Sequence, residues 1–137
     1  MLRLILFLMV FKLGFIAQAA EIKDQSISVK ADNLETLQEG EKVKFYGNVL
    51  IYFKDYLLKS DAVTIYFVNI DGQRKIDKAV IPTHMQLINH QNSNDIIVGD
   101  SAVYSRSSRT LEIHGNVKIQ KNNDLLVVNK LVLNLKK

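Results

Sequence analysis

The stretch FYGNVLI, residues 45–51, decides the fold because the chain contains it twice. It returns as IHGNVKI, residues 113–119, at an offset of 68 residues. The same offset aligns Asp32 with Asp100, and it aligns Leu57-Leu58 with Leu125-Leu126, without a gap. An internal repeat constrains the architecture before any single residue is interpreted. The chain is therefore predicted to consist of two copies of one structural unit.

Both copies alternate between apolar and polar residues. In the second copy, Leu111 and Ile113 point one way, while Glu112 and His114 point the other. Period-two alternation is typical of a strand with one face covered and the other in water. A glycine inside a strand usually marks a bulge, a bend or a close approach of another backbone. The repeated Gly-Asn pair therefore predicts a shared bend.

The rest of the body also has the pattern of successive strands. Asp71-Gly72 accepts the positive φ that a tight type I′ hairpin needs. Pro82 offers no ladder donor, so it predicts an edge strand or a bulge. No helical stripe is present outside the N-terminal leader, which favours a sandwich, barrel or roll. A short polar strand is expected to begin at 32–35 and to turn at 39–40. The other expected strands cover residues 25–30, 42–53, 56–68, 75–89, 96–104, 110–121 and 125–135.

Short polar residues recur at matching places in the repeat. Asp32, Asp61, Asp100 and Asn129 keep the same spacing from the Gly-Asn pairs. Four such residues in register could form a metal site. The favoured interpretation is structural, because a short polar side chain can bond its own backbone at a bend.

Composition limits the possible functions. The chain has 137 residues, 47% of them hydrophobic, which is enough for one domain with a core. It has no cysteine, which excludes disulfides and thiolate sites. The net charge of +4 includes Arg3 and Lys12 of the leader and is too small to indicate a nucleic-acid partner.

The first 19 residues are predicted to be a signal peptide. Arg3 precedes an apolar stretch, and Ala17-Gln18-Ala19 has the small-x-small form of a cleavage site. Cleavage after Ala19 would leave residues 20–137 as the mature domain. The alternative is an uncleaved anchor, but Lys12 interrupts an apolar run that is short against a span of about 20 residues. In both cases the body is exported.

Catalytic and metal chemistry are not supported by the pattern of residues. His84, His90 and His114 lack the spacing of metal ligands. Ser105 and the Ser107-Ser108 pair lie in a turn and lack the strand–turn–helix context of a nucleophile elbow. Nothing in the sequence singles out a pair of carboxylates for acid–base catalysis. We expect no enzyme activity, no catalytic residue, no metal and no cofactor.

Several ordered motifs resemble a known family. They are ADNL (31–34), GNVLI (47–51) and KSDAV (59–63), and they return as GDSAVY (99–104) and GNVKI (115–119). Over residues 26–135 the chain resembles the OstA-like, LptA-type family of periplasmic lipopolysaccharide-transport proteins. The middle strand departs from the pattern, with Pro82-Thr83-His84 where a third Gly-Asn would be expected.

The resemblance implies an all-β fold, an open (incomplete) antiparallel β-jelly roll of two sheets with a V shape. Its apolar interior would hold the lipid A acyl chains of lipopolysaccharide. Its ends would pair head to tail with further copies and with OstA-like partners of the inner and outer membranes. The edges expected to pair are Gln25–Lys30 and Leu125–Leu135. The residues of the inward phase, which the resemblance makes lipid-binding candidates, are Phe45, Val49, Ile51, Phe53, Val63, Ile65, Phe67, Leu111, Ile113, Val117, Ile119, Leu131 and Leu133.

Three functions remain open at this point. The first is a periplasmic bridge that carries lipopolysaccharide from the inner to the outer membrane. The second is a membrane-anchored accessory of the same export machine, which would retain residues 1–19. The third is a secreted structural β-protein with a dry core and no lipid ligand.

Overall fold

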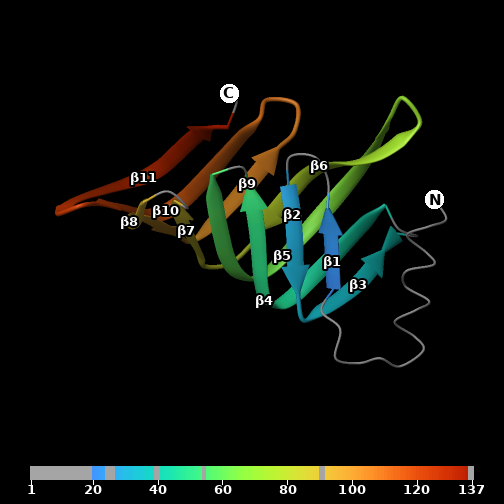
Figure 1. Cartoon of the computed structure of the whole chain (residues 1–137), viewed down its shortest axis with the longest axis horizontal. Helices are drawn as coiled ribbons and strands as arrows, with labels where there is room; N and C mark the ends of the chain where they lie inside the picture. The colour runs from blue at the N-terminus through green and yellow to red at the C-terminus, as the bar shows by residue number, and fades with distance from the viewer. Residues whose placement is uncertain (1–19, 24–26, 39–40, 54, 90–91, 136–137) are drawn as a thin grey trace.

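A computed structural model describes residues 20–23, 27–38, 41–53, 55–89 and 92–135 (Figure 1). None of the described residues belongs to a helix long and apolar enough to cross a membrane. The strands are β1 (Ala20–Lys23), β2 (Ile27–Ala31), β3 (Asn33–Leu37), β4 (Lys42–Phe53), β5 (Tyr56–Ile70), β6 (Gln73–Ile81), β7 (Met85–Asn89), β8 (Asn92–Gly99), β9 (Ser101–Ser105), β10 (Thr110–Lys121) and β11 (Asp124–Asn134).

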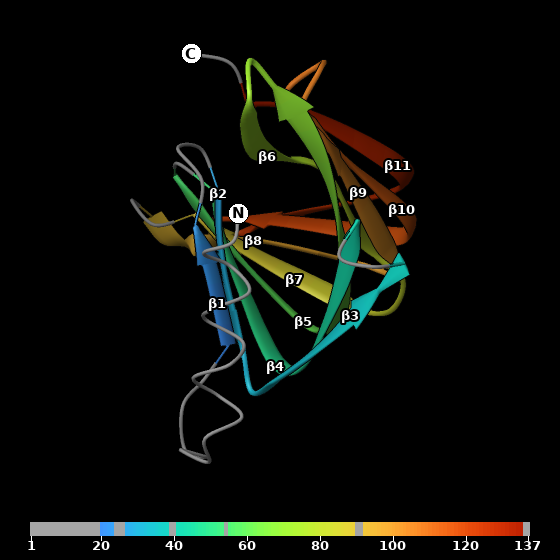
Figure 2. The same cartoon turned by 90° about the vertical axis from the view of Figure 1, so that its right-hand side faces the viewer.

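The strands form two antiparallel limbs that share four long strands. Strands β4, β5, β10 and β11 bend at their middle, so that one half of each lies in each limb. The first limb adds β1, β2, β7 and β8, and the second limb adds β3, β6 and β9. Figure 2 shows the two limbs meeting at the bends and parting at the opposite side, which we call the mouth. The predicted open, V-shaped jelly roll is confirmed.

Each bend is a bulge in which two residues oppose one. Gly47-Asn48 lies between the register pairs Tyr46↔Ala62 and Val49↔Ser60, opposite the single residue Asp61. Gly47 has a φ of +86° and Asn48 a φ of +49°. Glycine and asparagine tolerate this left-handed region better than other residues. The second copy repeats the arrangement at Gly115-Asn116, which explains why this dipeptide occurs twice.

An aspartate from the neighbouring strand fastens each bulge. The Asp32 amide donates to the Gly47 carbonyl at 2.9 Å, and Asn48 Nδ2 donates to Asp32 Oδ2 at 2.8 Å. In the second copy, Asn116 Nδ2 donates to Asp100 Oδ2 at 3.0 Å. These carboxylates therefore bond an amide on the adjacent strand. The expectation of a bond to their own backbone was wrong in this detail, although the bend itself was correct.

The middle of the chain bends without a Gly-Asn pair. The single strand expected over 75–89 is divided into β6 and β7 by Pro82-Thr83-His84. Both halves have neighbours on two sides, so Pro82 does not lie on an edge strand but in the three-residue break between β6 and β7. The strand expected over 96–104 is likewise divided at Asp100. Asp71 and Gly72 have φ of 52° and 78°, as a type I′ turn requires.

The core lies between the limbs. Its largest fully buried side chains include Phe45, Ile51, Ile65 and Leu111, and no polar or charged residue of the described part is buried. Burying each large apolar side chain contributes roughly 1.5–3 kcal/mol. The alternation of the sequence therefore gives both the strands and the force that holds the limbs together.

The bulge predicts a strong effect of Gly115→Ala. A Cβ at this position would lie 2.6 Å from Asp100 Oδ2, whereas a Cβ at Gly72 would meet nothing within 4 Å. Both glycines have a positive φ, so Gly72→Ala is a matched control for backbone strain alone. We expect a loss of unfolding free energy of about 2–4 kcal/mol for Gly115→Ala and about 1 kcal/mol for Gly72→Ala. Denaturant unfolding measures both, and equal losses would contradict the role assigned to the bulge.

Candidate functional site

The inward-phase residues predicted from the sequence meet in one apolar cluster between the limbs. The partly buried members are Phe67, Ile119, Leu131 and Leu133, which pack against the buried core. The buried members are Phe45, Val49, Ile51, Phe53, Val63, Ile65, Leu111, Ile113 and Val117. The structure thus brings all the lipid-binding candidates together.

Residues of the opposite phase lie on the outside, as predicted. Tyr52 follows the buried Ile51 and is half-buried on the outer face of the first limb. His114 follows the buried Ile113, and its Nε2 lies 3.2 Å from Glu112 Oε1. A one-residue step along either strand therefore changes the environment from the apolar interior to the outer surface.

An aromatic contact joins the limbs. Phe53 ends the part of β4 that lies in the first limb, and Tyr104 lies on β9 in the second limb. Their ring centroids are 5.4 Å apart with an interplanar angle of 47°. No backbone ladder of the described residues connects Phe53 with Tyr104, so only side chains hold this part of the interior closed.

The C-terminal end of the roll exposes an apolar edge. Within the described residues, β11 pairs with β10 and leaves its other edge open. Leu125, Leu126 and Val127 are 63%, 57% and 58% exposed. Leu126 pairs with Ile119, which has the inward phase, so the interior itself is uncovered at this end. Long apolar edges without a covering partner are templates for another strand.

The N-terminal end differs from the prediction. Gln25 lies outside the described residues. Residues 27–30 belong to β2 and are not an edge, because β2 pairs with β1 on one side and with β4 on the other. The open edges of the described part are therefore β1 in the first limb and β3 in the second. The prediction missed β1 because its four residues directly follow the leader and are too few to show a pattern.

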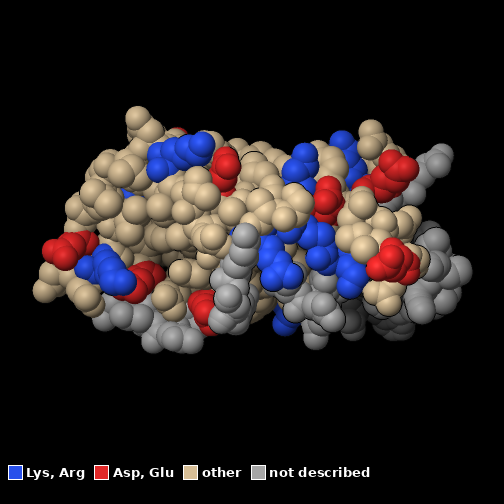
Figure 3. Space-filling view, turned by 90° about the horizontal axis from the view of Figure 1, so that it is seen from above, with Lys and Arg blue, Asp and Glu red and all other residues tan. Residues whose placement is uncertain are grey.

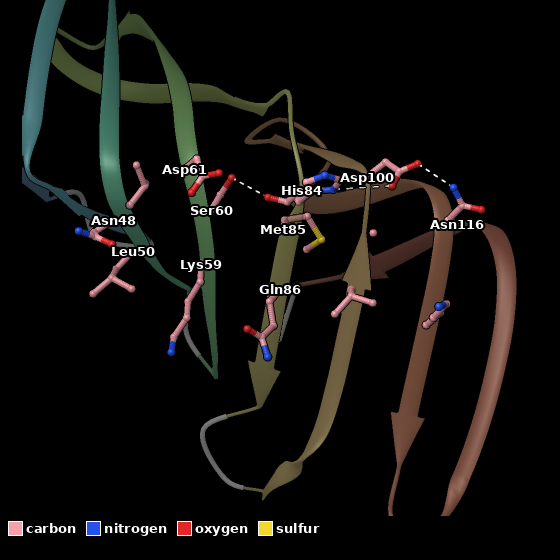
Figure 4. A pocket seen from close by; sticks show the side chains of 14 residues that line it. Asn48, Leu50, Lys59, Ser60, Asp61, His84, Met85, Gln86, Asp100 and Asn116 are labelled. Carbon is pink, nitrogen blue, oxygen red and sulfur yellow. Dashed lines mark hydrogen bonds and ion pairs between the residues drawn. The ribbon is translucent and has the colours of Figure 1, made fainter.

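A groove of about 640 Å³ lies on the outer face of the first limb, below the bends (Figure 4). Lys59, Gln86, Val98 and Lys118 are successive cross-strand neighbours along its floor. His84 Nδ1 stands 4.0 Å from Asp100 Oδ1 at the wall. The wall also includes Asn48, Asp61 and Asn116. Sequence reasoning assigned these residues to bends and did not foresee that the bends form one wall.

The described residues do not bring together a set of metal-binding or catalytic side chains. They contain no group of three or more His, Asp or Glu side chains that could hold a metal ion. His84 and His114 each face one carboxylate, and His90 lies outside the described part. Ser108 Oγ bonds Thr110 Oγ1 at 2.8 Å, in the turn expected for it. What the geometry offers is an apolar enclosure with open strand edges.

Comparison with known proteins agrees with this geometry. Residues 28–137 match the family described as "LptA/(LptD N-terminal domain) LPS transport protein". A relative, "Uncharacterized protein RP507" of Rickettsia prowazekii (strain Madrid E), is 27% identical over 131 residues, covering 96% of this chain and 88% of the relative.

A solved structure shares the fold. It is LptH of Pseudomonas aeruginosa, described as the LptA homologous periplasmic component of the conserved lipopolysaccharide transport device. The TM-score is 0.62 at 16% identity, and the match covers 82% of this chain and 78% of LptH. Because the family match extends over most of the chain, the protein belongs to the LptA/LptD N-terminal-domain family of lipopolysaccharide-transport proteins.

Proposed function

We propose that the mature protein is a periplasmic lipopolysaccharide-binding component of the bridge from the inner to the outer membrane. The observation that supports this most is the interior, in which every predicted inward-phase residue joins one apolar cluster without a buried polar residue in the described part. Such an interior suits hydrocarbon chains and offers nothing to a polar ligand. The family supports the lipid class, and the similarity to the periplasmic LptH supports the location.

Acyl chains enter between the limbs at the mouth. Separating Phe53 from Tyr104 opens this side without breaking a ladder hydrogen bond between them, because the limbs are continuous through the bends. Hydrocarbon from the ligand then replaces hydrocarbon contacts of the core. Since one apolar neighbour is exchanged for another, the exchange has a small net cost compared with exposing the same surface to water.

Copies and partners associate through their edges. The open edge of β11 in one molecule pairs with an N-terminal edge, β1 or β3, of the next. This contact joins two different surfaces, so it does not close on itself and can extend into a chain. It also covers Leu126 and continues the apolar interior from one molecule into the next.

One observation favours a second candidate. Val49, Ile51 and Ile113 have no exposed surface, as in a dry structural core. A secreted structural β-protein would need no ligand to keep this packing. The two functions differ in whether lipid reaches these residues in cells.

Photo-crosslinking separates these two functions. A diazirine-bearing leucine analogue placed at Ile51 or Ile113 is expected to capture lipopolysaccharide in cells, because both side chains line the interior. The matched controls are the same analogue at Tyr52 or His114, one residue further and on the outer face. Capture at both phases, or at neither, would show that the interior is not the path of the lipid.

Charge on the β11 edge should weaken association. Leu126→Lys and Val127→Lys place an ammonium group on the apolar edge, which disfavours pairing with another strand. Ile70→Lys is the control, since Ile70 is 39% exposed and lies at the β5–β6 turn. Light scattering over a concentration series is expected to show growth for the wild type and the control, and a constant monomer mass for the two β11 variants. A wild type that stays monomeric, even when mixed with partner domains, would contradict the bridge.

The leader is expected to be removed. Ala17-Gln18-Ala19 provides the cleavage site, and Lys12 makes the preceding stretch a poor membrane span. Terminal sequencing of the exported protein should begin at Ala20. Intact Met1 in the membrane fraction would instead support an anchored accessory of the export machine.

A further inference from the structure

The hairpin of β5 and β6 extends beyond the rest of the second limb. The ladder that joins β5 to β4 ends at Tyr66, and the ladder that joins β6 to β9 begins at Lys78. Between these points the two strands continue to Ile70 and Gln73, and in the described part of the chain their ladder there joins them only to each other. In Figure 1 the turn of this hairpin projects past the ends of the neighbouring strands. We call residues 67–76 the overhanging hairpin.

A bulge lies at the base of the overhanging hairpin. The register shifts directly before the pair Phe67↔Ile76, so that Asp77 has no residue opposite it. Such a bulge bends a strand and increases its twist. Two backbone bonds fasten the base, because the Phe67 amide donates to the Glu41 carbonyl at 3.2 Å and the Arg106 amide donates to the Asp77 carbonyl at 2.9 Å. Figure 2 shows the hairpin continuing from this base to a position above the mouth.

The inner face of the overhanging hairpin packs on the apolar interior. Ile76 is only 2% exposed, although it lies beyond the last ladder pair with β9. Its cross-strand partner Phe67 packs against the same core, and the Arg74 guanidinium lies over the Phe67 ring at 4.1 Å from the centroid. A ribbon that continued straight past the end of the limb would leave both apolar side chains in water. The hairpin therefore folds over the interior.

The overhanging hairpin covers the region where the two limbs meet. The next inward row of the second limb consists of Ile65, Ala79 and Tyr104, which are successive cross-strand neighbours. Tyr104 is the residue that contacts Phe53 of the first limb. Figure 3 looks down on the mouth and shows described side chains meeting across its middle without an opening. The interior is thus closed on this side by the hairpin and, beneath it, by the Phe53–Tyr104 contact.

The position of the hairpin depends on contacts that a ligand can replace. A two-stranded ribbon is marginally stable on its own, so the burial of Phe67 and Ile76 is a large part of what holds it down. These contacts are made between hydrocarbon groups. An acyl chain offers the same kind of surface, so exchanging one for the other exposes little apolar area to water.

We propose that the overhanging hairpin is a lid, which moves outward at its basal bulge to admit acyl chains and then closes over them. This inference rests on the proposed function, because the ligand must be apolar to replace Phe67 and Ile76. In the closed lid these two side chains fill the space next to Tyr104 that the acyl chains would enter. The lid shields an empty interior from water, as lids do over other binding sites.

Two spin-label distances distinguish a moving lid from limbs that separate as rigid units. The chain has no cysteine, so each label pair can be introduced into the otherwise unchanged mature protein. Ile70→Cys labels the exposed tip of the lid, and Lys44→Cys labels an exposed position on β4 in the body of the second limb. Lys59→Cys, on the outer face of the first limb, is the common reference. Pulsed electron paramagnetic resonance measures the 70–59 and 44–59 distances with and without lipopolysaccharide, and displacement of the fluorescent cis-parinaric acid reports binding in the same samples.

Binding is expected to lengthen the 70–59 distance by about 5 Å, half the spacing of two packed sheets, and to change the 44–59 distance much less. Equal lengthening of both distances would show that the limbs separate as units. Bound lipopolysaccharide with neither distance changed would show that lipid enters elsewhere. Each of these two results overturns the lid and leaves lipid binding intact. If neither cis-parinaric acid nor lipopolysaccharide binds, the proposed function fails, and the lid with it.

A pair of adjacent substitutions tests the apolar seat of the lid. Phe67→Ala removes a side chain that holds the lid on the core, so the rate of cis-parinaric acid uptake should rise about tenfold. Val68→Ala is the matched control, since Val68 follows on the same strand with the opposite phase, and its uptake rate should stay within about twofold of the wild type. Phe67→Leu keeps a smaller apolar side chain and should give a smaller increase, which preserves the test if Phe67→Ala folds poorly. A folded Phe67 variant with unchanged or slower uptake would overturn the lid.

Discussion

The fold depends on a two-residue bulge held by one aspartate. A long strand cannot pass from one sheet to another without a local break in its ladder, and the Gly-Asn pair supplies that break through two successive positive φ values. The break leaves backbone and side-chain groups that need partners. Asp32 and Asp100 satisfy them from the adjacent strand, so the bend is both permitted and fixed.

This constraint explains why the interior is a single apolar space. Because β4, β5, β10 and β11 bend at the same level, their inward faces turn toward each other along the whole roll. Bends at different levels would interrupt the space and direct some apolar residues to the outside. The repeat therefore makes the apolar interior continuous, since the second unit extends the space that the first unit begins.

Sequence reasoning predicted the features that depend on local pattern. The alternation of Phe45, Val49 and Ile51 determined which face is buried, and the offset between Gly47 and Gly115 placed two of the bends. Pro82 lies in the break between β6 and β7, as expected of a residue that gives the ladder no donor.

Features that depend on neighbours distant in the sequence escaped prediction. Strand β1 was missed because its pairing, not its composition, makes it a strand. The outer groove could not be predicted without knowing which strands are adjacent, since the residues of its floor, Lys59, Gln86 and Lys118, are far apart in the chain.

The two ends of the roll are unequal, and this inequality would give the proposed assembly a direction. Strand β11 offers 11 residues of edge with exposed Leu125, Leu126 and Val127, whereas β1 and β3 offer four and five. Two β11 edges could bury their leucines against each other, but that contact would close as a dimer and leave both N-terminal edges open. A β11 edge on β1 or β3 instead leaves one edge of each kind at the ends of every chain. In the proposed chain, the same contact repeats at every step, so each molecule has the same orientation relative to the next. An amphiphile with its head at the mouth could therefore pass from one interior to the next without turning over.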